Sequence, residues 1–390
     1  MHRRTFLTGM AALAGASVCS QAWAAPGNGR LLLVFLRGGY DAASVLVPWQ
    51  NAFYRESRPN IAINSPLPLD ANWGLHPVFK DTLYPLYQRG EASFIPFAGT
   101  HDLSRSHFET QDSIELGQPL DGRRDYNSGF LSRLTAEVDA HAAIAFTDGL
   151  PLICKGDTSI PNLSLKQGKP GKGDDRLAGL MQQMYAGHRL QGAVREGIEL
   201  RQEVGREMQK EEDADMAANR QAVSAKGFEL EARRMALLLR DRYRIGFVDV
   251  GGWDTHTQQG AEQGALATNL DTVGKGLAAF ANGMGSAWKQ TVVVVISEFG
   301  RTFRENGSRG TDHGHGSVYW LLGGGIKGGR IAGEQVPVNA ANLFQNRDYP
   351  VLNDYRAVLG DVFGSVFGLS GVALGRVFPG MVGGGKVGVV

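Results

Sequence analysis

Residues 31–41 read LLLVFLRGGYD, a run of six apolar residues followed by Arg37, two glycines, Tyr40 and Asp41. An unbroken apolar run of this length is typical of a strand that is buried on both faces, as in a parallel sheet covered by helices. The two glycines allow the chain to turn sharply where the strand ends. The stretch therefore predicts a buried central strand that presents a carboxylate in the loop at its carboxyl end.

The same pattern recurs along the chain. We predict further strands at 93–97, 142–147, 245–250, 292–296 and 318–322. Helical stretches separate them, at 78–88, 106–116, 175–242, 261–284 and 354–367. Strands that alternate with helices predict an α/β fold in which a mostly parallel sheet lies between two layers of helices. Because no linker or internal repeat interrupts residues 30–380, we expect a single domain there, followed by a flexible tail at 381–390.

The first 25 residues have the layout of a secretory signal. Arg3 and Arg4 precede an apolar stretch at 6–18, and residues 22–24 (AWA) form a small-x-small cleavage site. The arginine pair is typical of the twin-arginine type, and the apolar stretch is shorter than the roughly 20 residues of a membrane span. We expect cleavage near Ala24 and a periplasmic product that the twin-arginine machinery exports, without a stable membrane span. The alternative is an uncleaved anchor or a buried helix.

Charge and cysteine content narrow the class of protein. The formal net charge of the whole chain is +1, and it becomes −1 once the two signal arginines are removed. A nearly neutral protein does not favour nucleic acid or an anionic lipid surface as a partner. Cys154 would be the only cysteine of the mature chain, so no internal disulfide is expected.

Ligand-type side chains lie in four of the loops that adjoin predicted strands. In an open α/β sheet, ligands bind at the carboxyl ends of the strands. Carboxylates mixed with imidazoles suit zinc, manganese or iron, whereas calcium prefers oxygen alone. We therefore expect one or two divalent ions, zinc or manganese first. The candidate ligands are Asp41, Asp254, His256, Glu298 and, in the loop GTDHGHG (310–316), Asp312, His313 and His315.

Each of these residues also has an ordinary structural interpretation. Asp41 and Asp254 are in positions that suit a turn or a helix cap, and His256 suits a surface position. Glu298, at the end of a very apolar strand, is costly unless it is paired or bound to metal. Arg301 is its candidate salt-bridge partner.

The segment THDLSRSHF at 100–108 offers a nucleophile where a predicted strand gives way to a helix. Ser106 is either the helix N-cap or a nucleophile at the positive helix end, which favours an anionic substrate. Arg105 or Arg301 would stabilise charge on a transferred group. His101 and His107 are open to a role as ligands, as bases or as neither.

Five segments keep an order that resembles a known bacterial family, the domain of unknown function 1501: LRGGYD, SRSHFETQD, GGWDTH, SEFGRT and NGSRGTDHGHG. Its members are exported, often with twin-arginine signals, and are related to the alkaline phosphatase and sulfatase superfamily. The resemblance implies an alkaline-phosphatase-like α/β/α sandwich with metals at the carboxyl ends of the strands. It also implies Asp41 as an acidic metal ligand, Ser106 (or Ser104) as the nucleophile, and Asp254 with His256 as the pair that holds one metal.

The sequence departs from the superfamily at two places. Glu298-Phe299 stands where an Asp-His pair is usual, so one imidazole is missing, and Asp312, His313 and His315 lie near the place of the late histidine ligand. The formylglycine pattern Cys-x-Pro-x-Arg is not matched at Cys154, which disfavours an ordinary formylglycine sulfatase.

These features lead to one functional expectation and two alternatives. We expect a periplasmic metal-dependent hydrolase or transferase that acts on a phosphoester, or as second choice a sulfoester, of a small molecule or an envelope polymer. The first alternative is a non-catalytic envelope protein of the same fold with a structural metal, serving assembly or secretion. The second is a redox protein with iron or copper bound by histidine.

Overall fold

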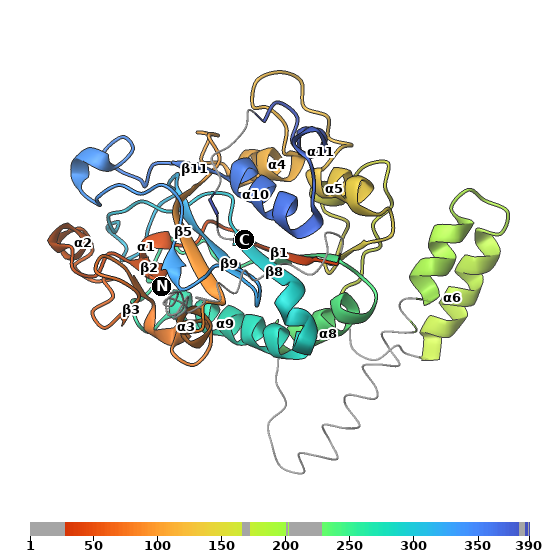
Figure 1. Cartoon of the computed structure of the whole chain (residues 1–390), viewed down its shortest axis with the longest axis horizontal. Coiled ribbons are helices and arrows are strands. Elements are labelled where there is room, and N and C mark those ends of the chain that lie inside the picture. The colour runs from red at the N-terminus through yellow and green to blue at the C-terminus, as the bar shows by residue number, and fades with distance from the viewer. Residues whose placement is uncertain (1–27, 166–171, 200–201, 203–227, 382–386, 389) are drawn as a thin grey trace, which may run out of the picture.

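An eight-stranded sheet forms the centre of the computed structural model, with strand order β10-β5-β9-β8-β1-β7-β6 and β11 paired to β5 (Figure 1). The structure describes residues 28–165, 172–199, 202, 228–381, 387–388 and 390. The predicted signal at 1–25 lies outside the described residues, as do positions 382–386 and 389 of the predicted tail. The single-domain assignment of residues 30–380 stays a prediction.

The apolar run at 31–36 forms the central strand, as predicted. β1 (Arg30–Leu36) pairs in parallel with β7 (Ile245–Val250) on one side and with β8 (Thr291–Ile296) on the other, and its residues 31–36 are fully buried. Burying each such side chain contributes about 1.5–3 kcal/mol. The remaining strands of this sheet are β5 (Ala92–Gly99), β6 (Ala143–Ala145), β9 (Ser317–Leu322), β10 (Arg330–Ile331) and β11 (Asn353–Asp354).

β9 runs against the rest of the sheet. It pairs antiparallel with both β5 and β8, while the other pairings are parallel. The sheet is therefore mostly parallel, as expected. Because β9 is reversed, its amino end lies at the edge where β1, β5, β7 and β8 have their carboxyl ends. The GTDHGHG loop, which precedes β9, thus reaches the same edge as the loops that follow the other strands.

Helices cover both faces of the sheet, which makes the fold an α/β/α sandwich (Figure 1). Leu32, Val34 and Leu36 of β1 pack in one core cluster and Leu31, Leu33 and Phe35 in the other, as the alternation of side chains along a strand requires. The first cluster includes residues of α3 (Leu83–Gln88), α8 (Phe228–Asp241) and α9 (Ala265–Met284). The second includes residues of α4 (His107–Leu116), α5 (Phe130–Val138), α10 (Tyr355–Phe367) and α11 (Gly371–Val377).

Two predicted helical segments are each observed as separate elements. The helix expected at 78–88 is divided into η1 (Pro77–Phe79) and α3, because Pro85 has no N–H and its ring is tolerated only in the first turn of a helix. The helical region expected at 175–242 includes α6 (Lys172–Met184) and α8, and residues 203–227 between them lie outside the described residues.

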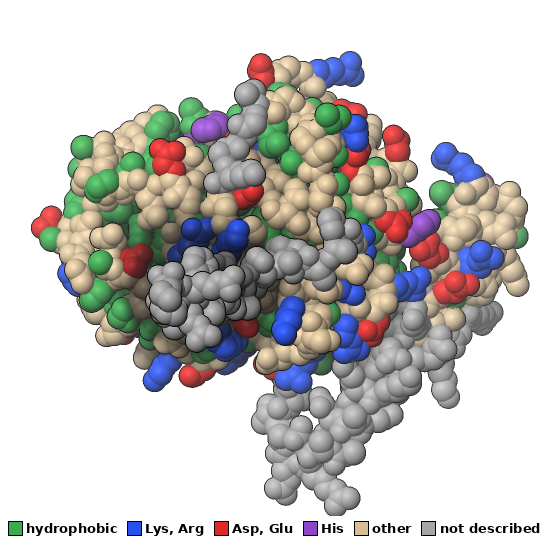
Figure 2. All heavy atoms as spheres, viewed as in Figure 1, with side chains coloured by type: hydrophobic (Ala, Val, Ile, Leu, Met, Phe, Trp, Pro, Cys, Tyr) green, Lys and Arg blue, Asp and Glu red, His purple; other side chains and the backbone are tan. Residues whose placement is uncertain are grey.

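The described chain also contains short elements: α1 (Ala42–Val45), α2 (Ala52–Ser57), β2 (Leu46–Val47), β3 (Leu67–Pro68), β4 (Gly74–Leu75), η2 (Leu152–Cys154), η3 (Gly285–Gln290) and η4 (Ala340–Asn342). None of the helices in the described part of the chain has the length and apolar character that crossing a bilayer requires. On the face seen in Figure 2, acidic and basic side chains are interspersed, in keeping with the nearly neutral composition.

Candidate functional site

Five loops meet at the carboxyl edge of the sheet. The amide of Gly38, after β1, donates to Oε1 of Glu298, after β8, over 2.8 Å. Nδ1 of His313, in the loop before β9, lies 2.9 Å from the carbonyl oxygen of Arg105, in the segment between β5 and α4. Asp254, after β7, forms an ion pair with Arg301. These loops therefore lie together at one edge of the sheet.

Three side chains at this edge could hold a metal ion. Ligand atoms of His107, Asp254 and His313 all lie within 4.8 Å of one another. Nε2 of His313 is 3.4 Å from Oδ1 of Asp254, and Nε2 of His107 is 3.6 Å from Oδ2 of the same carboxylate. Two imidazoles and a carboxylate form the donor set expected for a transition metal.

His107 is oriented by a buried carboxylate. Its Nδ1 lies 2.8 Å from Oε1 of Glu298, a side chain that is 0% exposed. Burial alone would raise the pKa of Glu298, but hydrogen bonds from His107 and Gln111 outweigh it and lower that pKa, so the carboxylate is ionised. An ionised carboxylate accepts the Nδ1 proton of His107 and leaves Nε2 of the ring free to bind a metal.

A chain of hydrogen bonds fixes Glu298 in turn. Nε2 of Gln111 donates to Glu298 over 2.8 Å, and Oε1 of Gln111 accepts from Arg37 over 2.9 Å. Arg37 also forms ion pairs with Glu115 and Asp249, each 2.7 Å long. Because the arginine can only donate, it sets the orientation of the Gln111 amide, and the amide then presents its N–H to Glu298.

Nε2 of His107 has no hydrogen-bond partner in the described part of the chain. The atom is buried, and no described residue provides a donor or an acceptor for it. Buried side-chain nitrogens are almost always paired in folded proteins, so an unpaired one calls for an explanation. Its position beside Asp254 and His313 fits a metal ligand.

His313 and His256 also turn their Nε2 atoms toward the Asp254 carboxylate. His313 donates from Nδ1 to the Arg105 carbonyl, and burial lowers its pKa, so Nε2 carries a lone pair. His256 places Nδ1 3.4 Å from Asp312, which leaves its Nε2 3.0 Å from Nε2 of His313 and 3.0 Å from Oδ1 of Asp254. At this distance, either one of the two Nε2 atoms carries a proton and donates to the other, or a cation lies between two lone pairs.

The spacing of these atoms fits a single ion. Donors that bind zinc tetrahedrally at 2.0–2.2 Å lie about 3.3 Å from one another. The separations given above for Asp254, His256, His313 and His107 run from 3.0 to 3.6 Å. These four separations are close to that value, and the ligand atoms of His107, Asp254 and His313 all lie within 4.8 Å of one another, so the residues present are of the type and near the spacing that a small divalent metal requires.

Phe299 forms the apolar wall of the site. Its ring lies against His107, with 4.8 Å between ring centroids, and against His313, at 5.0 Å. Gly39 approaches the same ring so closely that a Cβ there would lie 2.5 Å from it, and its φ of 61° is one that glycine adopts readily. Phe299 thus packs against the imidazole rings of His107 and His313.

Asp41 lies in a buried ion pair, which differs from its expected place in the metal site. Its oxygens accept from Arg58 over 2.5 and 2.9 Å, from Ser44 over 2.7 Å and from Gln259 over 2.7 Å. Burial would raise the pKa of Asp41, but the charge and hydrogen bonds of Arg58 keep it below the ordinary value. With both oxygens engaged in this way, Asp41 is left out of the proposed metal site.

Three other expected ligands also have different surroundings. Glu298 and Asp312 contact the outer nitrogens of His107 and His256, and so support the rings instead of joining the cluster. His315 packs its ring on Phe344, with 5.0 Å between centroids, and burial lowers its pKa to about 4. No contact joins the His315 ring to the cluster in the part of the chain that the structure describes.

The two arginines expected to act in catalysis have structural partners. The Arg301 side chain is buried and pairs with Asp254, not with Glu298 as its alternative interpretation suggested, and it also binds backbone carbonyls of Gly38 and Gly39. The Arg105 guanidinium pairs with Asp348 over 2.7 Å. Ser106 caps α4, since its Oγ accepts from the amide of Glu109 over 3.5 Å.

Sequence reasoning did not commit to His107 or Gln111. His107 is the first residue of α4 and directly follows the N-cap Ser106, in the segment between β5 and α4. Its place at the start of a helix near the other candidate loops was the signal that could have selected it. Gln111 is one helical turn beyond, on the same face, which is the spacing that brings two side chains together.

Fold and site together define an α/β protein with a possible His/Asp metal site at the carboxyl edge of its sheet. The chain belongs to the family described as protein of unknown function DUF1501, whose model matches residues 28–381. The family predicted from the five sequence segments is thus confirmed. A comparison with curated protein sequences finds no match.

Solved structures of low sequence identity are similar to the chain. One is a protein in the alkaline phosphatase superfamily from Vibrio parahaemolyticus, with 12% identity and a TM-score of 0.37, covering 78% of this chain and 64% of that one, less than two thirds of its length. Another is the lipoteichoic acid synthase LtaP from Listeria monocytogenes, with 9% identity and a TM-score of 0.41, covering 89% and 73%. A third is Ps i-CgsB in complex with k-i-k-neocarrahexaose, with 10% identity and a TM-score of 0.38, covering 88% and 72%.

Proposed function

We propose that the protein is exported to the periplasm and acts there as a metal-dependent hydrolase or transferase on a phosphoester, with a sulfoester as second choice. The observation that carries this proposal is the buried Nε2 of His107. It is held toward Asp254 and His313 and has no hydrogen-bond partner among the described residues. A small molecule or an envelope polymer would supply the ester.

The proposed ligands are His107, Asp254 and His313, and zinc or manganese is the proposed metal. Burial raises the pKa of Asp254, but the hydrogen bond and charge of Arg301 outweigh it and keep the carboxylate ionised, as a ligand must be. Three protein ligands leave coordination positions open, as in catalytic sites. When bound, such an ion polarises an ester oxygen and lowers the pKa of a bound hydroxyl or water. Since Asp41 is paired and Glu298 supports His107, we propose one ion instead of two.

The start of α4 favours an anionic ester. α4 has ten residues, Ser106 is its N-cap and His107 its first residue, so the amino end of the helix lies at the proposed metal site. The partial positive charge of a helix amino end attracts phosphate and sulfate groups. Ser106 is the proposed nucleophile because it carries a hydroxyl and directly precedes the proposed ligand His107.

Arg105 and Arg301 are proposed to act through other residues. The carbonyl of Arg105 holds His313, and Arg301 holds Asp254 and the loop at 38–39. The backbone of Arg105 and the guanidinium of Arg301 thus position the ligands, and the positive charge of both side chains adds to the attraction for an anionic substrate.

One observation favours the non-catalytic alternative. His256 places Nε2 3.0 Å from both Asp254 and His313, so it could act as a fourth ligand. Four protein ligands close a tetrahedral site, which is typical of structural zinc. In that case the protein would be an envelope protein with a structural metal, serving assembly or secretion.

Ester hydrolysis by the metal-loaded protein separates these possibilities. We would load the purified protein with zinc or manganese and supply p-nitrophenyl phosphate, bis(p-nitrophenyl) phosphate and p-nitrophenyl sulfate. The proposal predicts metal-dependent release of p-nitrophenol from a phosphate ester, lost in His107→Ala and kept in His141→Ala, which changes an exposed histidine outside the site. Bound metal with no turnover of any of these esters would support the structural alternative.

A further inference from the structure

His313, one of the three proposed metal ligands, is contacted by two arginines that both pair with Asp348. Nδ1 of His313 lies 2.9 Å from the backbone carbonyl oxygen of Arg105, and the backbone carbonyl of His313 accepts from Nη2 of Arg347 over 2.8 Å. Arg105 donates to Asp348 from Nε and Nη2 over 3.0 and 2.7 Å, and Arg347 donates to it from Nη1 over 3.2 Å. A single carboxylate therefore joins the two residues that contact the ring and the backbone of His313.

Asp348 has a fixed place in the fold. Its side chain is fully buried, and all three hydrogen bonds from the arginines reach the same atom, Oδ2. Its backbone closes a tight turn with Phe344, whose amide donates to the Asp348 carbonyl over 2.8 Å and whose carbonyl accepts from the Asp348 amide over 3.1 Å. Because an arginine can only donate, a buried acceptor in a fixed position orients both guanidinium groups.

Arg105 has a backbone conformation that its side-chain contacts help to maintain. Its φ of 53° lies in the left-handed region, which residues other than glycine adopt at a cost. Such conformations persist where the surrounding contacts hold them. The side chain of Arg105 is held by the ion pair with Asp348 and by a hydrogen bond of 2.8 Å from Nη2 to Oε1 of Gln345. The conformation that results directs the Arg105 carbonyl at Nδ1 of His313.

The Arg105 carbonyl selects the protonation of the His313 ring. A carbonyl oxygen can only accept, so Nδ1 carries the proton and Nε2 carries the lone pair. Nε2 is the nitrogen that lies 3.4 Å from Oδ1 of Asp254, where the ion is proposed to bind. Without the carbonyl, the neutral ring could carry its proton on Nε2, which could not then bind a metal.

We propose that Asp348 is a positioning residue for His313, and that it acts through Arg105 and Arg347 to keep Nε2 of the ring unprotonated and directed at the metal. The inference rests on the proposed function, since His313 is one of the ligands proposed there. Asp348 acts only through the two arginines, because its carboxylate forms no hydrogen bond with any other residue that the structure describes.

Two substitutions at Arg105 separate the backbone conformation from the charge. Arg105→Ala and Arg105→Gly remove the same guanidinium and the same contact with Asp348, but glycine adopts a positive φ readily and alanine does not. We expect zinc affinity, measured by competition with a chelating dye, to fall about tenfold in Arg105→Ala and at most about threefold in Arg105→Gly. The loss of charge alone, or a general loss of stability, would affect the glycine variant at least as much. Wild-type affinity in Arg105→Ala, or affinity in Arg105→Gly no higher than in Arg105→Ala, would overturn the proposal.

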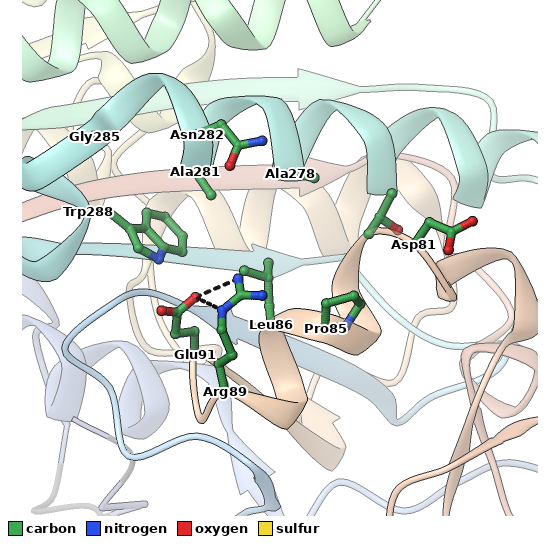
Figure 3. A pocket seen from close by; sticks show the side chains of 11 residues that line it. Asp81, Pro85, Leu86, Arg89, Glu91, Ala278, Ala281, Asn282, Gly285 and Trp288 are labelled. Atoms are coloured by element: carbon green, nitrogen blue, oxygen red, sulfur yellow. Dashed lines mark hydrogen bonds and ion pairs between the residues drawn. The ribbon is translucent and has the colours of Figure 1, made fainter.

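Asp348→Asn tests the carboxylate itself. The amide keeps the size of the side chain but removes its charge, so we expect zinc affinity to fall about tenfold in a protein whose circular dichroism is that of the wild type. Arg89→Ala is the control, because Arg89 pairs with Glu91 over 2.9 Å beside a pocket at the amino end of β5, away from the metal site (Figure 3). It should bind zinc like the wild type. Wild-type affinity in a folded Asp348→Asn would contradict the proposal.

The protonation of the His313 ring gives a readout that needs no metal. Burial lowers the pKa of His313, so its ring is neutral at about pH 8. Long-range nitrogen–proton NMR spectra of the metal-free protein then show which ring nitrogen carries the proton, with the His313 signals identified by their loss in His313→Gln. We expect the proton on Nδ1 in the wild type and in Arg105→Gly, and a mixture of both forms in Arg105→Ala. A wild-type ring protonated on Nε2, or an unchanged ring in Arg105→Ala, would overturn the proposal. If the wild type binds no zinc, the proposed function fails, and the ring protonation alone decides the role of Asp348.

Discussion

His107 places its Nδ1 2.8 Å from Oε1 of Glu298, a carboxylate that lies wholly within the protein at the end of the central sheet. This contact turns Nε2 of the ring toward Asp254 and His313. A histidine whose outer nitrogen donates to a carboxylate is the usual arrangement of a metal ligand in proteins. The relationship explains why a glutamate is tolerated after the very apolar strand β8, since it is ionised and fully hydrogen-bonded there.

Glu298→Gln should weaken metal binding without unfolding the protein. The amide keeps the size of the side chain and one acceptor oxygen, but it removes the charge that holds the Nδ1 proton of His107. We expect zinc affinity to fall by roughly 10- to 100-fold, as measured by competition with a chelating dye. Glu137→Gln, which changes a surface carboxylate paired with Arg376, is the control. Unchanged affinity in Glu298→Gln would mean that the carboxylate does not support a ligand.

Two substitutions at Ser106 separate the cap from the nucleophile. Ser106→Ala removes both the cap and the hydroxyl, and it should lower the free energy of unfolding by about 0.5–2 kcal/mol. Ser106→Asn keeps a capping oxygen and should restore most of that stability. If Ser106 is the nucleophile, both variants lose ester turnover when they are loaded with metal. Turnover that survives in Ser106→Asn would limit the role of Ser106 to capping α4.

Asp41→Asn should destabilise the fold instead of emptying the metal site. The substitution leaves the Arg58 guanidinium buried at 0% exposure without its counter-charge. Removing one partner of such a pair costs about 3–5 kcal/mol, which denaturant unfolding can measure. Asp271→Asn, in an exposed pair with Lys275, should change stability by at most about 0.5 kcal/mol. A stable Asp41→Asn protein with lowered zinc affinity would return Asp41 to the metal site.

His76 should make the protein less stable in mild acid. Its side chain is buried, with Nδ1 accepting from the Val78 amide over 3.2 Å and Nε2 3.1 Å from the Ala261 carbonyl. Burial lowers the pKa of His76 below the value of about 6.5 that it has in the unfolded chain. Below pH 6.5 the unfolded state therefore binds more protons, so stability falls as the pH drops toward the folded pKa. Unfolding free energies measured between pH 7 and 5 should fall less steeply in His76→Gln, and equal slopes would contradict this.

The sequence predicted those parts of the fold that depend on local pattern. The apolar runs of β1, β7 and β8 identify buried strands, and the polar loops after them identify the working edge of the sheet. The division of the helix expected at 78–88 was missed, although it depends on Pro85, whose effect is local. The order of the strands and the reversed direction of β9 are not local, because they depend on which strands pair across the whole chain.

The candidate site was predicted less completely for the same reason. Asp254, His313, Asp41 and Glu298 were all expected as ligands. In the structure Asp41 instead pairs with Arg58, and Glu298 accepts from His107. Arg58 lies 17 residues from Asp41, and His107 lies 191 residues from Glu298, so no local pattern reveals either contact. From the sequence alone, every imidazole and carboxylate in these loops is an equally good candidate ligand. Their roles differ only once their hydrogen-bond partners in the fold are known.

The metal content of the purified protein tests the central claim most directly. The wild type, His107→Ala and His141→Ala would each be loaded with zinc, freed of excess metal and analysed by inductively coupled plasma mass spectrometry, with circular dichroism to verify folding. The account predicts one tightly held ion per chain in the wild type and in His141→Ala, and its loss from a folded His107→Ala. A wild-type protein that retains no stoichiometric zinc or manganese, or a His107→Ala protein that retains it fully, would contradict the account.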